Sequence, residues 1–186
     1  VAAANAADSS AGLSPGALAI ISGSGLSRSG VTTKVEIGGV PARVTAANSF
    51  QLHVQLPPDL TPGDYPLRVE SGYGGADGVV RMQLVSPAIF LTEGAVVNQD
   101  GTVNSIASPA KRGQAITIYC TGLGAVAAHG ALLKTVLPVT AILQDQELTV
   151  QYSGAAANLP GVYQVNVVLP ATVAPGLGLE LRLRQG

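Results

Sequence analysis

The sequence predicts an all-β chain built from two tandem antiparallel β-sandwiches. One motif occurs twice, as FQLHVQLPPDLTPG over 50–63 and as YQVNVVLPATVAPG over 163–176. An aromatic residue, a glutamine, an alternating strand, Leu-Pro and Pro-Gly recur in the same order, which indicates two related domains. No stretch sustains a period of 3.6 residues, and 23 glycines and 12 prolines separate the short apolar runs. Short strands with frequent turns are typical of antiparallel sandwiches.

The duplication extends upstream of the motif. The copies begin 97 residues apart, at Gly16 and Gly113, and end 113 residues apart, at Gly63 and Gly176. The second copy therefore carries 16 additional residues between these points. A constant offset at each end indicates duplication followed by a loop insertion. We assign residues 1–87 to the first domain and 88–186 to the second.

Alternation of apolar and polar residues, together with turn residues, places the strands of the first domain. Gly38-Gly39 predicts a two-residue hairpin turn. Residues 1–14 form a lead-in that includes at most a short first strand. The main strands are expected over 17–22, 34–37, 40–44, 50–56, 65–70 and 79–85. At Gly63, and at its counterpart Gly176, we expect a type II turn with positive φ.

The second domain opens with a segment that has no counterpart in the first. Residues 95–104 contain an Asp-Gly pair and predict a hairpin. Its other strands are expected over 115–120, 139–144, 147–152, 163–169 and 177–184. Only ten residues follow Gly176, enough for one strand where the first domain has two. We expect residues 95–104 to pair with the second domain's sheet and fill this gap, which gives a monomer. The alternative is an open edge that recruits a strand from another chain as a dimer.

Composition excludes several classes of protein. Hydrophobic residues make up 47% and charged residues 11%, which is the balance of a folded chain. The net charge is −1, and neither half is basic, so we expect no nucleic-acid partner. No apolar run is long enough to span a bilayer, so we expect no membrane insertion. No signal peptide is visible, and we interpret the chain as a mature fragment or as a piece excised from a longer protein.

Several stretches resemble the IPT/TIG immunoglobulin-like domains. They include the Gly-Ser-Gly-Leu stretch at 23–26, VEIGGVPA at 35–42 and TPGDYPLRV at 61–69. Over nearly its full length, the chain is similar to a C-terminal module of uncharacterised exported proteins from Acidobacteria such as Solibacter. NQDGT at 98–102 and TGLG at 121–124 carry that likeness. The resemblance implies tandem immunoglobulin-like sandwiches and a secreted or cell-surface location, and it brings no catalytic residues.

Few residues are candidates for chemistry. Cys120, the one cysteine, shares a strand face with Ile116 and Ile118, so we interpret it as a packed core residue rather than a nucleophile. His129 has no metal partner at ligand spacing. The oxygen-bearing run 98–104 lacks the glycine position of a calcium loop, because Gly101 comes too early. We therefore expect no catalytic residue, no cofactor and no metal.

Three hypotheses for function remain. The first is a non-catalytic, extracytoplasmic spacer, adhesion or docking module with a protein or cell-surface partner. The second is a carbohydrate-binding accessory module of a secreted enzyme, using amide and imidazole side chains on the solvent faces of the motif strands. Its ligand-binding residues would be Gln51, His53, Gln55, Gln164 and Asn166. A small hydrolase built on Cys120 is the third.

Overall fold

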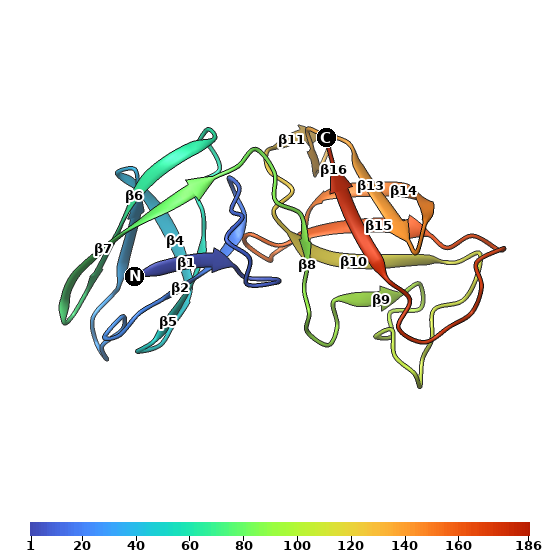
Figure 1. The fold of residues 1–186 in the computed structure, drawn as a ribbon, viewed down its shortest axis with the longest axis horizontal. Helices are drawn as coiled ribbons and strands as arrows, with labels where there is room; N and C mark the ends of the chain where they lie inside the picture. The colour runs from blue at the N-terminus through green and yellow to red at the C-terminus, as the bar shows by residue number, and fades with distance from the viewer.

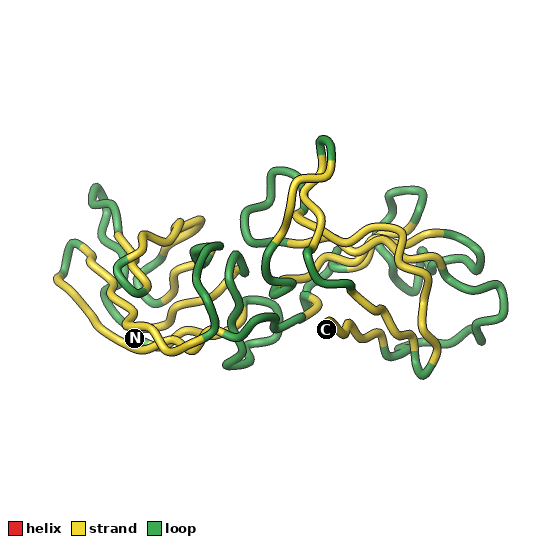
Figure 2. Tube along the Cα trace, turned by 90° about the horizontal axis from the view of Figure 1, so that it is seen from above, coloured by secondary structure: helices red, strands yellow, loops and turns green.

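The computed structural model describes residues 1–186 and consists of strands and loops only (Figure 2). Two β-sandwiches lie side by side along the long axis of the molecule (Figure 1). No helix of the length and apolarity needed to cross a membrane is present. The chain is thus two tandem immunoglobulin-like antiparallel β-sandwiches, and the predicted fold class is confirmed.

The first sandwich contains seven strands in the order β1-β2-β5-β4-β3-β6-β7. They are β1 (Ala2–Asn5), β2 (Leu18–Ser22), β3 (Lys34–Ile37), β4 (Val40–Ala47), β5 (Gln51–Gln55), β6 (Gly63–Ser71) and β7 (Gly74–Met82). Every strand pairing among them is antiparallel.

The second sandwich contains the remaining nine strands. They are β8 (Ala88–Ile89), β9 (Val96–Asn98), β10 (Ala115–Thr121), β11 (Val126–His129), β12 (Leu132–Thr135), β13 (Val139–Leu143), β14 (Gln146–Ala155), β15 (Tyr163–Val168) and β16 (Leu181–Gln185). One sheet has the order β11-β12-β14-β15-β10-β8, with β9 also on β10, and the other joins β14, β13 and β16. The hairpin of β11 and β12 accounts for much of the inserted length.

One long strand in each sandwich belongs to both of its sheets. Residues Val40–Ala42 of β4 pair with β3 and residues Arg43–Ala47 pair with β5, and the ladder with β5 shifts register between Val44 and Ala46. In the second copy β14 does the same, with its shift between Val150 and Tyr152. A bulge bends a strand and increases its twist, and in each copy the bulge comes shortly after the strand has changed sheets. The two copies therefore share this strand, which passes from one sheet to the other, as well as the order of their other strands.

Alternating apolar side chains fill each sandwich. In the first, Leu52 and Val54 of β5 are fully buried, and in the second Val165 and Val167 of β15 take the same place. The two cores form separate clusters of 14 and 12 buried residues. Each domain therefore buries its own apolar interior.

The structure corrects some local predictions. The strand expected at 79–85 begins at Gly74, so most of the glycine-rich segment is strand and not turn. The final strand spans Leu181–Gln185 and not 177–184. Gly63 has φ 156° at the start of β6, far from the value near +80° of a type II turn, and Gly176 has no positive φ. The type II prediction is wrong at both glycines.

The segment 95–104 forms a hairpin whose Asn98 N–H donates to the carbonyl oxygen of Thr102 at 2.8 Å. Its strand β9 pairs with β10, so the expected pairing with the second domain's sheet is present. That place corresponds to β1 beside β2 in the first sandwich, and not to β7 beside β6. The hairpin therefore leaves the space after β16 unfilled, because it occupies the other sheet.

Candidate functional site

The five predicted ligand-binding residues lie on two different sheets. Gln51, His53 and Gln55 follow β5 in the first sandwich, and Gln164 and Asn166 follow β15 in the second. Gln51 is exposed and the other four are half-buried. The motif strands thus carry these side chains on outer faces, but they do not form one continuous surface.

Two tyrosines flank the amides on β15. Tyr119 of β10 lies directly opposite Gln164, and Tyr152 of β14 lies opposite Asn166. Opposite residues of antiparallel strands share a face, so all four side chains lie on the outer surface of this sheet. The Nε2 of Gln164 donates to the Oδ1 of Asn166 at 2.8 Å. Sequence reasoning missed this grouping, although the alternation of Tyr119 with buried neighbours could have indicated it.

Hydrogen bonds of the Tyr152 hydroxyl fix the position of its ring over β14. It lies 3.2 Å from the carbonyl oxygen of Leu133 and 3.1 Å from that of Ala155. The side chain passes Gly154, where an added Cβ would lie 2.9 Å from the ring carbon that bears the hydroxyl. Burial raises the pKa of Tyr152, so its hydroxyl stays protonated. The ring is therefore fixed beside Asn166 as a flat apolar surface.

On the outer face of the first sandwich, the polar residues of β5 have mostly apolar neighbours on the adjacent strands. Ile20 of β2 and Ala46 of β4 lie opposite His53 on either side. Leu18 and Arg43 flank Gln55 in the same way. His53 therefore lies between apolar neighbours and not among groups that would orient it as a base.

Gln55 also lines a groove between the two sandwiches. The groove has a volume of about 650 Å³, and Arg43, Asp59 and Asn158 contribute polar groups to it. The loop that joins β14 and β15 forms its other wall. Gln55 is the only one of the five predicted residues in this groove.

A buried joint connects the sandwiches beside the groove. The Oγ1 of Thr121 accepts a hydrogen bond from the N–H of Leu18 at 2.8 Å and donates to the carbonyl oxygen of Gly161 at 2.7 Å. The hydroxyl of Tyr163 donates to the carbonyl oxygen of Gly124 at 2.6 Å and lies 3.4 Å from that of Pro15. Thr121 is fully buried, and burial raises the pKa of Tyr163. These two side chains bring the start of β2 against the second core.

The connecting segment adds backbone contacts to this joint. The N–H of Ser86 donates to the carbonyl oxygen of Gly122 at 2.8 Å, and the Nδ2 of Asn5 donates to the carbonyl oxygen of Ser86 at 3.3 Å. At Gly122, with φ 84°, a Cβ would collide with the Ser86 carbonyl oxygen. At Gly161, with φ 75°, a Cβ would lie 3.0 Å from the backbone nitrogen of Leu18. Only glycine allows the backbones to approach so closely.

Cys120 is a packed core residue, as predicted. Its side chain is fully buried, and its Sγ lies 3.8 Å from the carbonyl oxygen of Tyr163. Burial raises the pKa of the thiol, which disfavours the thiolate a nucleophile needs. His129 is exposed on β11, and no group of three or more His, Cys, Asp or Glu side chains could hold a metal ion.

The hairpin 95–104 uses its oxygen atoms internally. Asp100 Oδ1 accepts hydrogen bonds from the Thr102 hydroxyl at 2.6 Å and from its N–H at 3.1 Å, which lower the pKa of the carboxyl. Asn98 Nδ2 donates to the Thr102 hydroxyl at 3.0 Å and to the carbonyl oxygen of Ser108 at 2.7 Å. This arrangement is a closed turn.

An apolar pocket opens at one end of the second sandwich. Its volume is about 470 Å³, and its walls include Ala95, Ile116, Leu169 and Leu181. Arg112 is the only basic residue in the lining. Nothing in the sequence analysis predicted this pocket, because it lies between elements that are far apart in the chain.

No protein-family model matches the sequence, and no curated protein matches it. Among solved structures, the chain is similar to SGBP-B of the Bacteroides ovatus mixed-linkage glucan utilization locus, solved with a mixed-linkage heptasaccharide. The identity is 15% and the TM-score is 0.32; the alignment covers 94% of this chain and 38% of that one. A titin tandem of Ig domains is 10% identical with a TM-score of 0.25, and the alignment covers 94% of this chain and 89% of that one.

Proposed function

We propose that the chain is a non-catalytic, extracytoplasmic tandem of immunoglobulin-like domains that acts as a spacer, adhesion or docking module of a larger exported protein. The single observation that carries this proposal is the buried joint at Thr121 and Tyr163. A spacer has to keep a fixed geometry, and domains joined only by an exposed linker move independently. The IPT/TIG-like resemblance supports the exported setting.

The chemistry of the joint suits this role. Its hydrogen bonds join hydroxyl, amide and backbone groups, and no charged side chain takes part. Such bonds are not screened by salt, unlike surface ion pairs. The proposed geometry therefore holds over the range of ionic strength that an exported protein meets.

The surroundings of Cys120, the residue considered as a nucleophile, support a non-catalytic role. Cys120 is inaccessible and its thiolate is disfavoured. The nucleophile of a cysteine hydrolase needs a base within hydrogen-bond reach. The hydrogen-bond partner of Cys120 is a backbone carbonyl instead.

Small-angle X-ray scattering tests the spacer. We expect the profile of the intact chain to fit the single arrangement in Figure 1, at low and at high salt alike. A profile that only an ensemble of domain orientations can fit would refute a fixed spacer. Turnover in an esterase, peptidase and glycosidase panel that Cys120→Ala abolishes would refute the non-catalytic assignment.

Carbohydrate binding is a second candidate, favoured by the tyrosine and amide face of the second sandwich. Sugar rings stack on aromatic side chains, and amides bond sugar hydroxyls. Tyr119, Tyr152, Gln164 and Asn166 supply both on adjacent strands.

A glycan array tests the carbohydrate candidate and identifies the face. We expect any hit to weaken in Tyr119→Ala and in Gln164→Ala, and to persist in Gln51→Ala on the other sandwich. An array without hits would eliminate the candidate. A hit that Gln51→Ala alone removes would instead assign binding to β5.

A further inference from the structure

We propose that the tyrosine and amide face of the second sandwich binds an acidic polysaccharide through one of its uronate rings. The ring stacks on Tyr152, its carboxylate pairs with Lys134, and its hydroxyl groups bond the amides of β15. This inference rests on the carbohydrate-binding candidate proposed above and specifies its ligand.

Lys134 joins this face through the hairpin of β11 and β12. It lies on β12 directly opposite Gly154 of β14, and Gly154 lies opposite Gln164 of β15. Gln164 in turn lies opposite Tyr119 of β10. Opposite residues of antiparallel strands share a face, so these residues form one row across four strands. With strands about 4.8 Å apart, the row is about 14 Å long, which gives room for more than one sugar ring.

The ring of Tyr152 lies beside Lys134 in this row. Its hydroxyl contacts the carbonyl oxygens of Leu133 and Ala155, and a Cβ added at Gly154 would lie 2.9 Å from the ring carbon that bears the hydroxyl. The ring therefore covers Gly154, the residue opposite Lys134. Tyr152 is half-buried, as expected of a ring with one face on the strand and the other open to solvent.

The two amides on the far side of this ring are positioned for hydroxyl groups. The Nε2 of Gln164 donates to the Oδ1 of Asn166 at 2.8 Å, which fixes both side chains. Neither amide forms another hydrogen bond, so the Oε1 of Gln164 is free to accept and the Nδ2 of Asn166 is free to donate. A hydroxyl group both donates and accepts, so neighbouring hydroxyl groups of one sugar ring match this pair.

Lys134 has no acidic partner. It is half-buried and takes part in none of the ion pairs of the chain. Of the five acidic residues in the second domain, only Glu147 lies on a strand, in the part of β14 that pairs with β13, and it bonds Arg184 at 3.1 Å. The other four lie in loops and turns. A carboxylate of a ligand would therefore be the counter-ion of this ammonium group.

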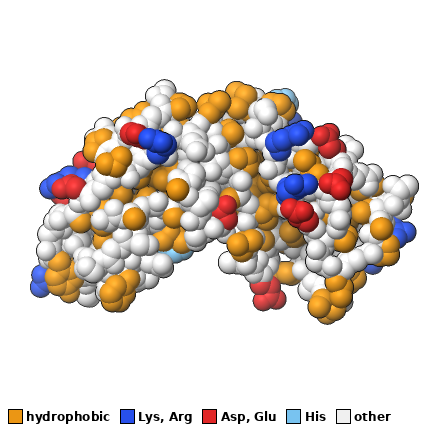
Figure 3. Space-filling view, in the orientation of Figure 1, with side chains coloured by type: hydrophobic (Ala, Val, Ile, Leu, Met, Phe, Trp, Pro, Cys, Tyr) orange, Lys and Arg blue, Asp and Glu red, His pale blue; other side chains and the backbone are white.

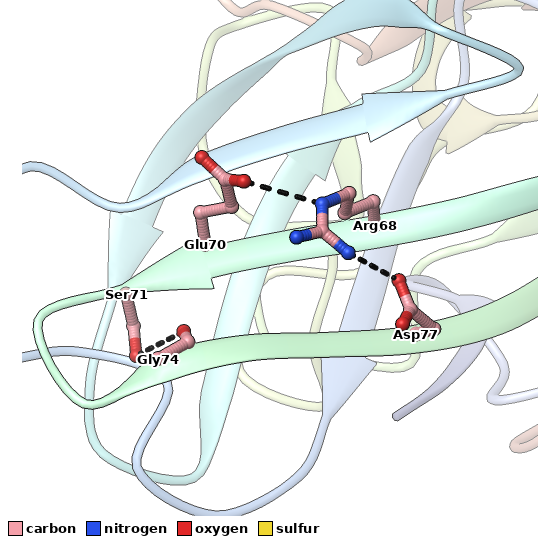
Figure 4. A network of polar contacts seen from close by, with 5 residues as sticks. All are labelled: Arg68, Glu70, Ser71, Gly74 and Asp77. Carbon is pink, nitrogen blue, oxygen red and sulfur yellow. Dashed lines mark hydrogen bonds and ion pairs between the residues drawn. The ribbon is translucent and has the colours of Figure 1, made fainter.

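Several other basic residues have their counter-ions within the chain. Arg68 of β6 lies between Glu70, at 3.2 Å, and Asp77 of β7, at 3.0 Å (Figure 4). Across the second core, the two arginines of β16 pair with acidic residues around β13. The space-filling view shows acidic and basic side chains grouped over β13 and β16 (Figure 3). Lys134, in contrast, is left to solvent or to a ligand.

The first sandwich shows that the fold does not require these residues. By register on the motif strand, Ser22 of β2 takes the place of Tyr119, and Ala46 of β4 takes the place of Tyr152. Lys134 belongs to a hairpin that the first sandwich lacks. The same arrangement of strands thus forms without either tyrosine and without the lysine, so all three are available for a role other than folding.

A uronate matches the order of these groups. Its pyranose ring carries the carboxylate at one end and ring hydroxyl groups at the opposite end. Lys134 and the amides of β15 likewise lie on opposite sides of the Tyr152 ring. Tyr119, two strands away from Tyr152, offers a second aromatic surface to another ring of the same chain. A sulfate ester carries the same sign of charge, so the experiment has to distinguish it from a carboxylate.

Calorimetry with matched oligosaccharides tests the ligand. The probes are trimers of galacturonate, glucuronate and mannuronate, the same trimers with their carboxylates reduced to alcohols, and a sulfated galactose trimer. We expect at least one uronate trimer to bind the intact chain and its reduced form to bind at least about threefold more weakly. Salt at about 0.5 M should weaken binding of the uronate and not of the reduced form, because only the uronate binds through an ion pair.

Three variants assign the contacts. Lys134→Gln should weaken uronate binding at least about threefold and leave binding of the reduced trimer unchanged. Lys34→Gln, on β3 of the first sandwich, removes the same charge from an exposed strand position and should bind as the unchanged chain does. Tyr119→Ser installs the residue of the first sandwich and should weaken both forms, because it removes an aromatic surface. Circular dichroism checks that all three remain folded.

Four outcomes would overturn the proposal. They are absence of binding by every uronate trimer at millimolar concentration, equal binding of the uronate and reduced forms, Lys134→Gln that binds like Lys34→Gln, and tighter binding of the sulfated trimer than of any uronate. Binding of neutral sugars alone would remove the uronate and keep the carbohydrate candidate, whereas a glycan array without hits would remove both. The spacer is measured by scattering and is independent of these results.

Discussion

Replacing Thr121 with valine should release the two sandwiches from each other. Valine has the shape of threonine but cannot accept from Leu18 N–H or donate to Gly161 C=O. An unpaired buried group costs about 1–3 kcal/mol, and water can reach the half-buried Leu18 more readily than Gly161. We therefore expect Thr121→Val to lose about 3 kcal/mol. For domains of this size that corresponds to a fall in Tm of roughly 12–24 °C.

Two measurements separate this effect from simple destabilisation. Urea unfolding gives the free energy, and the number of transitions shows whether the sandwiches still unfold together. Scattering below the midpoint shows whether the folded domains have become mobile. Below the midpoint of urea unfolding, we expect the parent chain to keep the scattering profile that it has without urea. For Thr121→Val we expect a broader distribution of molecular dimensions.

Thr117→Val is the matched control. Thr117 lies on the same strand, and its half-buried hydroxyl forms no hydrogen bond. This variant should change stability by less than about 0.5 kcal/mol. Thr121 does not hold the two sandwiches together if Thr121→Val behaves like Thr117→Val, or if Thr121→Val loses stability while its scattering profile stays that of the parent chain.

Further predictions concern the same residues and the surface ion pairs. Gly161→Ala should cost at least about 1 kcal/mol by urea unfolding, because alanine is strained at φ 75° and its Cβ would meet the backbone of Leu18. Cys120 should react with a thiol reagent only as fast as the domain opens, and labelling in native buffer at the rate of a free thiol would contradict its burial. The hydrogen bond from Arg81 lowers the pKa of Asp64 below its usual 3.8, so that pair stabilises the fold above this pH and loses its effect as the pH falls through the folded pKa. The stability difference between Arg81→Gln and the parent should therefore shrink between pH 5 and pH 2, and a difference independent of pH would contradict the assignment.

The sequence was sufficient for the elements that local patterns determine. Alternation along 50–56 and 163–169 located β5 and β15, and the phase of Cys120 with Ile118 predicted its burial. Gly38 and Gly39 predicted the turn between β3 and β4, and both have positive φ. These features depend on neighbours within one or two strands, so they are visible in the sequence.

Features that depend on the relation between distant strands could not be predicted. The bulge at Gln151 turns Tyr152 to the outer face beside Asn166, and no local pattern indicates it. Thr121 gains its role from Leu18, which is 103 residues away in the chain. The place of β9 beside β10 was also hidden, because strand count alone does not say which sheet is short of a strand. The sequence therefore predicted the amide side chains of the candidate binding face, but not the tyrosine beside them or the contacts of the joint.

The strand that belongs to both sheets also determines how each sandwich carries load. Force that slides one sheet past the other acts on a strand, β4 or β14, whose first part is hydrogen-bonded to one sheet and whose remainder is hydrogen-bonded to the other. Because it belongs to both sheets, such a strand couples them mechanically and transmits tension from one to the other. Resistance to shear is thus built into each repeat through its backbone and does not depend on a disulfide.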